Sequence, residues 1–275
     1  MFAVIKGAGD LASGIALRLS HSGFQIAMTE IAAPLSVRRT VCFSQAVYSG
    51  SCRVEDVTAV LVDSEEKMRA VFAEKQIAVF IDPAAEIVKK YRPDILVDAI
   101  MAKKNTGTAI KDAPVVIGIG PGFTAGVDCH CVIETKRGHT LGRVITGANG
   151  TAACALPNTG VPGDIGGYTS ERLLRSPAEG AFHALASIGD VVRKGDILAV
   201  VRFGAAEGEK EIPIKAEIDG MIRGLLPSGI HVKSGMKSGD IDPRCERSHC
   251  FTVSDKALSI GGGVLEGIMQ ITNSK

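Results

Sequence analysis

The densest group of chemically active side chains lies in the stretch VDCHCVIETKRGH, near the middle of the chain. If residues 127–135 form a strand, side chains two positions apart share one face, and the polar ones at 128, 130 and 134 then point the same way. Carboxylates, imidazoles and a guanidinium gathered in this way are typical of acid–base catalysis, or of binding to a hard metal or an oxyanion. A polar network at a domain boundary is the structural alternative. The candidate catalytic residues are Asp128, His130, Glu134, Arg137 and His139.

Two cysteines interleave with this cluster. Cys129 and Cys131 fall on the opposite, apolar face of the same strand, together with Ile133. Free cysteine is commonly a small buried hydrophobic residue, so we predict no metal site here. The chain has seven dispersed cysteines and no CxxC pair, which favours a reduced, cytoplasmic protein over a disulfide-stabilised one.

A glycine-rich loop near the beginning of the chain is the second candidate site. The apolar run at 2–5 is followed by Gly7-Ala-Gly9-Asp10-Leu-Ala12, the GxGxxA form of the dinucleotide-binding fingerprint. Gly7 permits the tight turn, Gly9 lets the backbone approach a pyrophosphate, and Ala12 permits close packing of the following helix. The first amides of that helix would point at an anion. The loop predicts a nucleotide or NAD(P) site, with an empty turn as the alternative.

Glu30 completes this first strand–helix–strand unit. Gly23 is expected to end the helix, residues 24–28 to form the second strand, and Glu30 to end it. An acidic residue about 20 positions beyond the glycines is where the hydroxyl groups of a ribose are bound. Arg38 and Arg39 follow, where they would meet a 2′-phosphate or face solvent, so the choice between NAD and NADP stays open.

Strand-like and helix-like stretches continue to alternate up to about residue 125. Short β-rich runs occur at 57–62, 77–81 and 95–100, and helix-like stretches at 64–74 and 84–91 separate them. Repeated strand–helix units favour a doubly wound parallel sheet. Ligands bind at the carboxyl ends of the strands of such a sheet.

The second half of the chain contains an internal repeat. Its positions are Gly180, Gly189, Val192 and Gly195 in one copy, and Gly220, Gly229, Val232 and Gly235 in the other. Equal spacing suggests two interlocking halves related by a pseudo-twofold axis. The pattern is similar to the biotinyl/lipoyl barrel-sandwich hybrid. Carrier domains of that family have a lysine flanked by Met, Asp or Ala on the joining hairpin. Lys210 lacks these flanks, so covalent biotin or lipoate is not expected.

These patterns give an expected fold class and a set of domains. The expected fold is α/β, with an N-terminal Rossmann-like doubly wound sheet plus a C-terminal β barrel-sandwich-hybrid (biotinyl/lipoyl-like) module. The expected domains are a nucleotide-binding domain at 1–125, a polar β segment with a Gly/Pro-rich loop at 126–172, the β module at 173–243, and a tail with a helix at 244–275.

Two features of the tail stand out. Asp240-Ile-Asp242-Pro-Arg244 is a compact polar sequence. The helix predicted after it, capped by Ser254 or Asp255, contains the glycines 261–263, which weaken a helix unless another backbone or a ligand comes close.

Composition argues against several classes of partner. A net charge of +1 gives no electrostatic footprint for a polyanion, and aromatic residues at 4% without tryptophan provide no stacking platform for single-stranded nucleic acid. No apolar run approaches the ~20 residues that span a bilayer. We expect a soluble cytoplasmic protein without nucleic-acid or membrane partners; a homo-oligomer is left open.

Several long motifs together resemble one known family. They are KGAGDLASGIALRL, VRRTVCFSQAVYSG, GPGFTAGVDCHCVIETKRGHTLGRVI, RSPAEGAF, KSGMKSGDIDPR and SDKALSIGGGVLE. They resemble the YqeB-like accessory proteins of selenium-dependent molybdenum hydroxylases, over essentially the whole chain. The resemblance implies a bacterial protein that helps to mature a xanthine-dehydrogenase-like hydroxylase with labile selenium on its molybdenum centre. It implies the hydroxylase as a client protein, and it names a pathway rather than a reaction.

The leading hypothesis is a nucleotide-binding maturation factor for such a hydroxylase. The loop from Gly7 to Ala12 and Glu30 would hold the nucleotide, the cluster from Asp128 to His139 would face it across a cleft, and the β module would dock the client. An NAD(P)-dependent oxidoreductase acting on a small substrate is the first alternative. A non-catalytic adaptor for the hydroxylase is the second.

Overall fold

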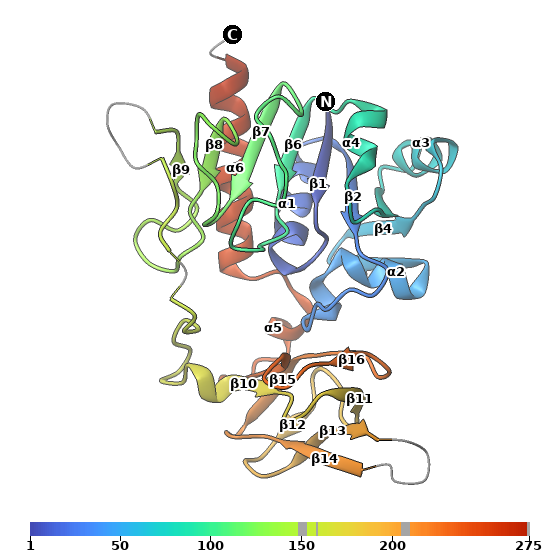
Figure 1. Cartoon of the computed structure of the whole chain (residues 1–275), viewed down its shortest axis with the longest axis vertical. Helices are drawn as coiled ribbons and strands as arrows, with labels where there is room; N and C mark the ends of the chain where they lie inside the picture. The colour runs from blue at the N-terminus through green and yellow to red at the C-terminus, as the bar shows by residue number, and fades with distance from the viewer. Residues whose placement is uncertain (148–152, 158, 205–209, 274–275) are drawn as a thin grey trace. The chain divides into compact units, whose positions relative to one another are not determined.

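The chain folds into two compact units, each assembled from segments that lie far apart in the sequence (Figure 1). The computed structural model describes residues 1–147, 153–157, 159–204 and 210–273. Unit 1 comprises Met1–Pro34, Cys42–Thr159 and Val253–Lys275, and unit 2 comprises Leu35–Val41 and Gly160–Thr252. The sequence instead predicted contiguous domains, because a strand or helix pattern does not indicate which distant segment it will pack against.

A nine-stranded sheet forms the centre of unit 1, in the order β3-β4-β5-β2-β1-β6-β7-β8-β9. The strands are β1 (Phe2–Lys6), β2 (Gln25–Glu30), β3 (Ser51–Val54), β4 (Val57–Leu61), β5 (Ile77–Ile81), β6 (Ile95–Asp98), β7 (Val115–Ile119), β8 (Cys131–Ile133) and β9 (Val144–Ile145). From β4 to β8 all neighbouring strands pair in parallel, while the edge strands β3 and β9 pair antiparallel. The inner strands are almost continuously buried, as expected where helices cover both faces.

Helices cover the two faces of this sheet. The helices of unit 1 are α1 (Asp10–His21), α2 (Ala46–Ser49), α3 (Glu65–Ala73), α4 (Glu86–Tyr91) and α6 (Asp255–Asn273). Helices α3 and α4 join a core cluster with Val4, Ala27 and Val116 on one face. On the other face α1 and α6 lie side by side, and α6 also contacts β7, β8 and β9 (Figure 1). Among the described residues, no helix combines the length and apolarity needed to cross a bilayer.

The expected fold class is wrong. In unit 1 the sheet is mixed rather than purely parallel. The alternation of strand and helix also stops after β6, since residues 99–114 and 120–130 contain no helix. A doubly wound sheet takes its covering helices from the crossover connections. Here α6, from the other end of the chain, covers the sheet at β7 to β9.

Unit 2 consists of two separate four-stranded antiparallel sheets, in the orders β10-β17-β15-β12 and β14-β13-β11-β16. Its strands are β10 (Leu173–Arg175), β11 (Gly180–Ala184), β12 (Val191–Val192), β13 (Ile197–Phe203), β14 (Lys210–Lys215), β15 (Gly220–Leu225), β16 (His231–Val232) and β17 (Lys237–Asp242). A short helix, α5 (Ser248–Phe251), follows them.

The internal repeat is confirmed in the backbone, and its two copies interlock. Gly180 in β11 pairs with Val232 in β16, and Gly220 in β15 pairs with Val192 in β12, so each copy supplies a strand to the other. The paired turn glycines all have positive φ: Gly189 (98°), Gly195 (97°), Gly229 (89°) and Gly235 (77°). The barrel-sandwich-hybrid module belongs to the expected fold class, which is wrong as a whole; unit 2 forms two separate four-stranded antiparallel sheets, to which β10 and β14 also belong. Lys210 begins β14, and residues 205–209 of the joining hairpin lie outside the described residues.

Close packing accounts for the glycines inside α6. A Cβ added at Gly14 of α1 would lie 2.6 Å from the Cβ of Ala257, and one at Gly261 would lie 2.8 Å from the carbonyl oxygen of Gly14. A Cβ at Gly263 would collide with the carbonyl oxygen of Gly142. The same Cβ at Gly261 would lie 2.8 Å from Cγ of Arg18. Since Gly14 faces Ala257 and Arg18 faces Gly261, the two helices run parallel. Their N-termini therefore lie at the same edge of the sheet, where the parallel strands end.

This packing predicts opposite effects at neighbouring glycines. Gly263→Ala should lower the free energy of unfolding by about 1–3 kcal/mol, because the new methyl group has no space. Gly262→Ala is the matched control, since a Cβ there meets nothing within 4 Å. It should raise stability by roughly 0.5–1 kcal/mol through helix propensity. Urea unfolding measures both, and equal effects of the two changes would contradict the packing.

Candidate functional site

The glycine loop connects β1 to α1 at the carboxyl edge of the sheet. Gly7 has a φ of +91°, and its amide donates to the carbonyl oxygen of Thr29 at 2.9 Å. A Cβ at Gly7 would lie 3.1 Å from the carbonyl oxygen of Ala99, so this turn requires glycine. Gly9 is the N-cap of α1, and as a glycine it provides no side-chain cap. The first turn of α1, from Asp10 to buried Ala12, thus presents its backbone amides at this edge.

Glu30 lies beside this loop, as predicted, and binds the loop's own backbone. One carboxylate oxygen accepts a hydrogen bond from the amide of Ala8 at 3.1 Å, and the other accepts from the amide of Ile31 at 2.9 Å. On the other side of the loop, the carbonyl oxygen of Ala8 accepts from the amide of Ser44 at 2.9 Å and from the Ser13 hydroxyl at 3.2 Å. Both backbone groups of Ala8 are therefore fixed, and the loop is held in one shape.

A buried ion pair lies next to the loop, and no sequence motif predicted it. Lys6 ends β1 and Asp98 ends the neighbouring β6, and their Nζ and Oδ2 atoms are 3.0 Å apart. Thr108 bridges them: its hydroxyl accepts from Lys6 at 2.7 Å and donates to Asp98 at 2.5 Å. All three residues are buried. The sequence does contain a hint of this pair, since each of the two apolar strands ends in a charged residue. Adjacent parallel strands end at the same edge of a sheet, so these two charges could have been expected to meet.

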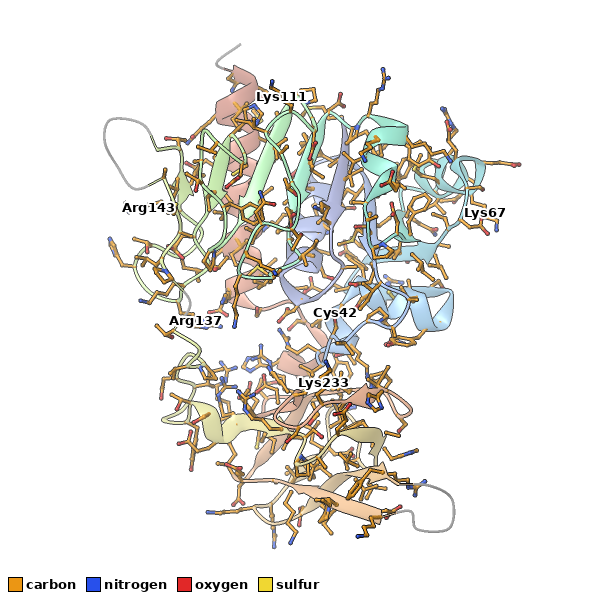
Figure 2. The ribbon with its side chains drawn as sticks, in the orientation of Figure 1. Cys42, Lys67, Lys111, Arg137, Arg143 and Lys233 are labelled. Atoms are coloured by element: carbon orange, nitrogen blue, oxygen red, sulfur yellow. The ribbon has the colours of Figure 1, made fainter. Side chains whose placement is uncertain are left out.

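The beginning of α6 adds basic side chains to the same edge. Arg137, labelled in Figure 2, forms two hydrogen bonds with Asp255, at 2.8 and 3.0 Å. Lys256 is partly buried. Burial lowers its pKa, the charge of Arg137 acts in the same direction, and the charges of Asp10 and Glu134 oppose the shift. Lys256 therefore lies within electrostatic range of the first residue of α1, a placement that follows from the parallel packing of α1 and α6.

Glu134 is a structural carboxylate in this arrangement. It directly follows β8 and is 2% exposed. One of its oxygens accepts from the amide of Lys136 at 2.7 Å, and the other accepts from the amide of Leu156 at 2.8 Å. Glu134 thus ties the segment at Leu156 to the end of β8.

The structure does not bring Asp128 and His130 together with Glu134. Strand β8 is shorter than the predicted strand at 127–135, so Asp128 and His130 precede it while Glu134 follows it. His130 accepts a hydrogen bond from the amide of Val116 through Nδ1 at 3.0 Å, and Asp128 accepts from the amide of Thr124 at 2.7 Å. Since β8 runs parallel to β1, these two residues lie at the amino edge, opposite the glycine loop.

The remaining predicted residues are also placed. His139 is exposed in the turn after β8. Cys129 and Cys131 are buried, as predicted, and burial raises the pKa of each thiol to about 12. Arg38 and Arg39 belong to unit 2, where they donate to backbone carbonyl oxygens.

Comparison with known proteins identifies the kind of chain this is. No protein-family model matches it. It is 49% identical over 268 residues to the uncharacterized protein YqeB of Escherichia coli (strain K12), in an alignment that covers 98% of this chain and 47% of that protein. The chain is therefore YqeB-like over almost its whole length, and it spans less than half of that relative.

Likenesses to solved structures are weak. An aspartoacylase family protein from Mesorhizobium loti has 14% identity and a TM-score of 0.30, over 87% of this chain and 84% of that chain. A succinylglutamate desuccinylase from Silicibacter sp. TM1040 has 12% identity and a TM-score of 0.28, over 87% and 84%. The product-bound ectoine utilization protein EutE (DoeB) from Ruegeria pomeroyi has 12% identity and a TM-score of 0.26, over 78% and 57%. Because these scores are low, neither a substrate nor a reaction is taken from them.

The buried pair next to the loop gives a stability prediction. Lys6→Met should lower the free energy of unfolding by about 3–5 kcal/mol, because it leaves the Asp98 carboxylate buried without its cation. Lys67→Met is the control: Figure 2 shows Lys67 on α3, and its ion pair with Asp63 is largely exposed. That change should cost less than about 1 kcal/mol. Urea unfolding separates the two, and an equally small effect of Lys6→Met would contradict the role assigned to the pair.

Proposed function

We propose that this chain is a nucleotide-binding accessory protein for a selenium-dependent molybdenum hydroxylase, and that the nucleotide binds at the loop from Gly7 to Ala12. The observation that carries the binding part is the start of α1. A 12-residue helix begins there with Gly9 as its N-cap, directly after a rigid glycine turn. The positive end of the helix dipole and the first-turn amides favour phosphate oxygens.

Basic side chains support an anionic ligand at this edge. Lys256 is within electrostatic range of Asp10, and Arg137 contributes a second cation. Asp10, Glu134 and Asp255 are acidic neighbours, but the two oxygens of Glu134 are bound by backbone amides and Asp255 is paired with Arg137. Lys256 is therefore the side chain we expect to approach the phosphates.

The maturation part of the proposal rests on the motifs that the chain shares with YqeB-like proteins. The likeness covers 98% of the chain. The hydroxylase client, the selenium and molybdenum context and the cytoplasmic location are parts of this proposal. Asp128 and His130 have no role in it, because they lie at the amino edge of the sheet. An oxidoreductase with His130 beside a nicotinamide loses its support for the same reason.

A non-catalytic adaptor is the second candidate, and one observation favours it. The carboxylate of Glu30 already accepts the amide hydrogen of Ala8 in the loop. A carboxylate at that place fills part of the anion-binding surface. In the adaptor the loop would hold no nucleotide, and the hydroxylase would bind elsewhere on the chain.

Calorimetric titration of the whole chain with ATP, CTP, NAD and NADP tests the choice. At least one nucleotide should bind, and Gly9→Glu should weaken that binding by more than about tenfold, because a carboxylate would enter the phosphate site. Gly262→Glu is the control, with the same change at an exposed position of α6.

Three outcomes are distinguishable. Binding that Gly9→Glu removes and Gly262→Glu preserves supports the nucleotide site. The absence of heat with all four nucleotides would contradict it. The adaptor would be favoured by two results together. The unchanged protein would bind no nucleotide, and the Gly9→Glu protein would still retain the hydroxylase in a pull-down.

A further inference from the structure

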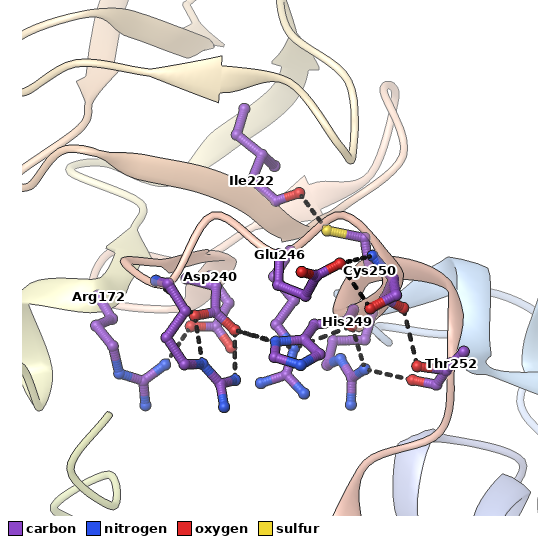
Figure 3. A network of polar contacts seen from close by, with 12 residues as sticks. Arg172, Ile222, Asp240, Glu246, His249, Cys250 and Thr252 are labelled. Atoms are coloured by element: carbon purple, nitrogen blue, oxygen red, sulfur yellow. Dashed lines mark hydrogen bonds and ion pairs between the residues drawn. The ribbon is translucent and has the colours of Figure 1, made fainter. Parts of the chain in front are cut away.

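The polar sequence Asp240-Ile-Asp242-Pro-Arg244 is the centre of a charged cluster in unit 2 that the proposed function does not use. Asp240 and Asp242 are two positions apart on β17, so their side chains emerge on the same face of the strand. They are 6% and 1% exposed. Figure 3 shows this cluster, with Arg172 beside Asp240 and His249 directed at a neighbouring carboxylate.

Each carboxylate contacts more than one cation. Asp242 lies 2.6 Å from Arg244, 3.7 Å from Arg223 and 3.8 Å from the His249 ring. Asp240 lies 2.8 Å from Arg172 and 3.9 Å from Lys237. These contacts join four cations to two carboxylates, and Glu171 acts on Arg172 as a third carboxylate, so the cations exceed the carboxylates by one.

The buried cations of this cluster hold its structure together, and the exposed ones can reach a ligand. Arg172 and Arg223 are buried and also donate to backbone carbonyl oxygens, so they fix the cluster and contribute their field. The side chains of Arg244, Lys237 and His249 are 44%, 40% and 35% exposed. These three are accessible to a small ligand in unit 2. Glu246 and Arg247, on the same segment, carry opposite charges and leave the surplus unchanged.

Asp242 orients the guanidinium of Arg244. Its two oxygens accept from Nε at 2.9 Å and from Nη2 at 2.6 Å, so one edge of the planar group is gripped and the direction of the other edge is fixed. Burial by itself would raise the pKa of Asp242, but the hydrogen bonds from Arg244 and the charges of Arg244 and Arg223 outweigh it and lower the pKa to about 2. The carboxylate therefore holds Arg244 throughout the neutral pH range.

We propose that this cluster binds a doubly charged phosphate group of a small molecule, with Arg244 as its main contact and Lys237 and His249 beside it. A pre-oriented guanidinium matches the spacing of two phosphate oxygens, and the excess of cations favours an anionic group. The site lies in unit 2, and its residues are independent of the nucleotide site proposed in unit 1.

Titration with inorganic phosphate tests this proposal, using the whole chain with Gly9→Glu so that the loop in unit 1 does not contribute. Phosphate should bind to this protein, and adding Arg244→Gln should weaken binding by at least about tenfold, because a charge-assisted pair of hydrogen bonds is lost. Arg202→Gln is the matched control: Arg202 is 40% exposed on β13 and pairs with Glu211. It should leave the affinity within about twofold.

Arg244→Lys keeps the charge but loses the two-pronged geometry, so its affinity should fall between the other two. Thermal melting checks that each variant is folded. If Gly9→Glu alone abolishes phosphate binding, the anion site belongs to unit 1 and the inference for unit 2 is overturned. Equal phosphate affinity with and without Arg244→Gln would overturn it as well.

Discussion

The close packing of α6 against α1 is the contact on which the candidate site in unit 1 depends. Small residues at Gly14, Ala257 and Gly261 let the two backbones approach, and this contact fixes the helices as a parallel pair. Parallel helices have their positive ends at the same edge. The end of the chain thereby supplies Lys256 to a loop that is formed by its first residues.

Contacts from several elements also hold the glycine loop in one shape. The ion pair between Lys6 and Asp98 joins the ends of β1 and β6 next to it, and Glu30 and Ser44 hold Ala8 from two sides. A loop fixed in this way costs little further conformational entropy when a ligand binds. The carboxylates of Glu30 and Asp10 oppose an anion at this edge. Glu30 already accepts from the loop, so a bound nucleotide would have to displace its carboxylate or bind beside it.

Local patterns in the sequence were reliable where the structure is decided locally. The turn at Gly7, the burial of Cys129 and Cys131, the final helix and the internal repeat of unit 2 all depend on spacing within a short segment. The predicted fold class was wrong because it depends on pairings between distant segments. The edge strands β3 and β9 pair antiparallel with their neighbours, and α6 covers the part of the sheet where crossover helices were expected. The predicted grouping of Asp128, His130 and Glu134 on one strand face does not form, for a related reason. Strand β8 ends after three residues, so alternation along a longer strand does not place its two ends on one face.

The central claim is that the first turn of α1 receives the phosphates of a nucleotide. A crystal structure of the whole chain soaked with whichever nucleotide binds in solution tests it most directly. The account predicts phosphate oxygens within hydrogen-bonding distance of the amides of Leu11 and Ala12, with the Lys256 ammonium group turned toward them. A nucleotide bound elsewhere, with Glu30 still accepting from Ala8 and the start of α1 facing only solvent, would contradict it.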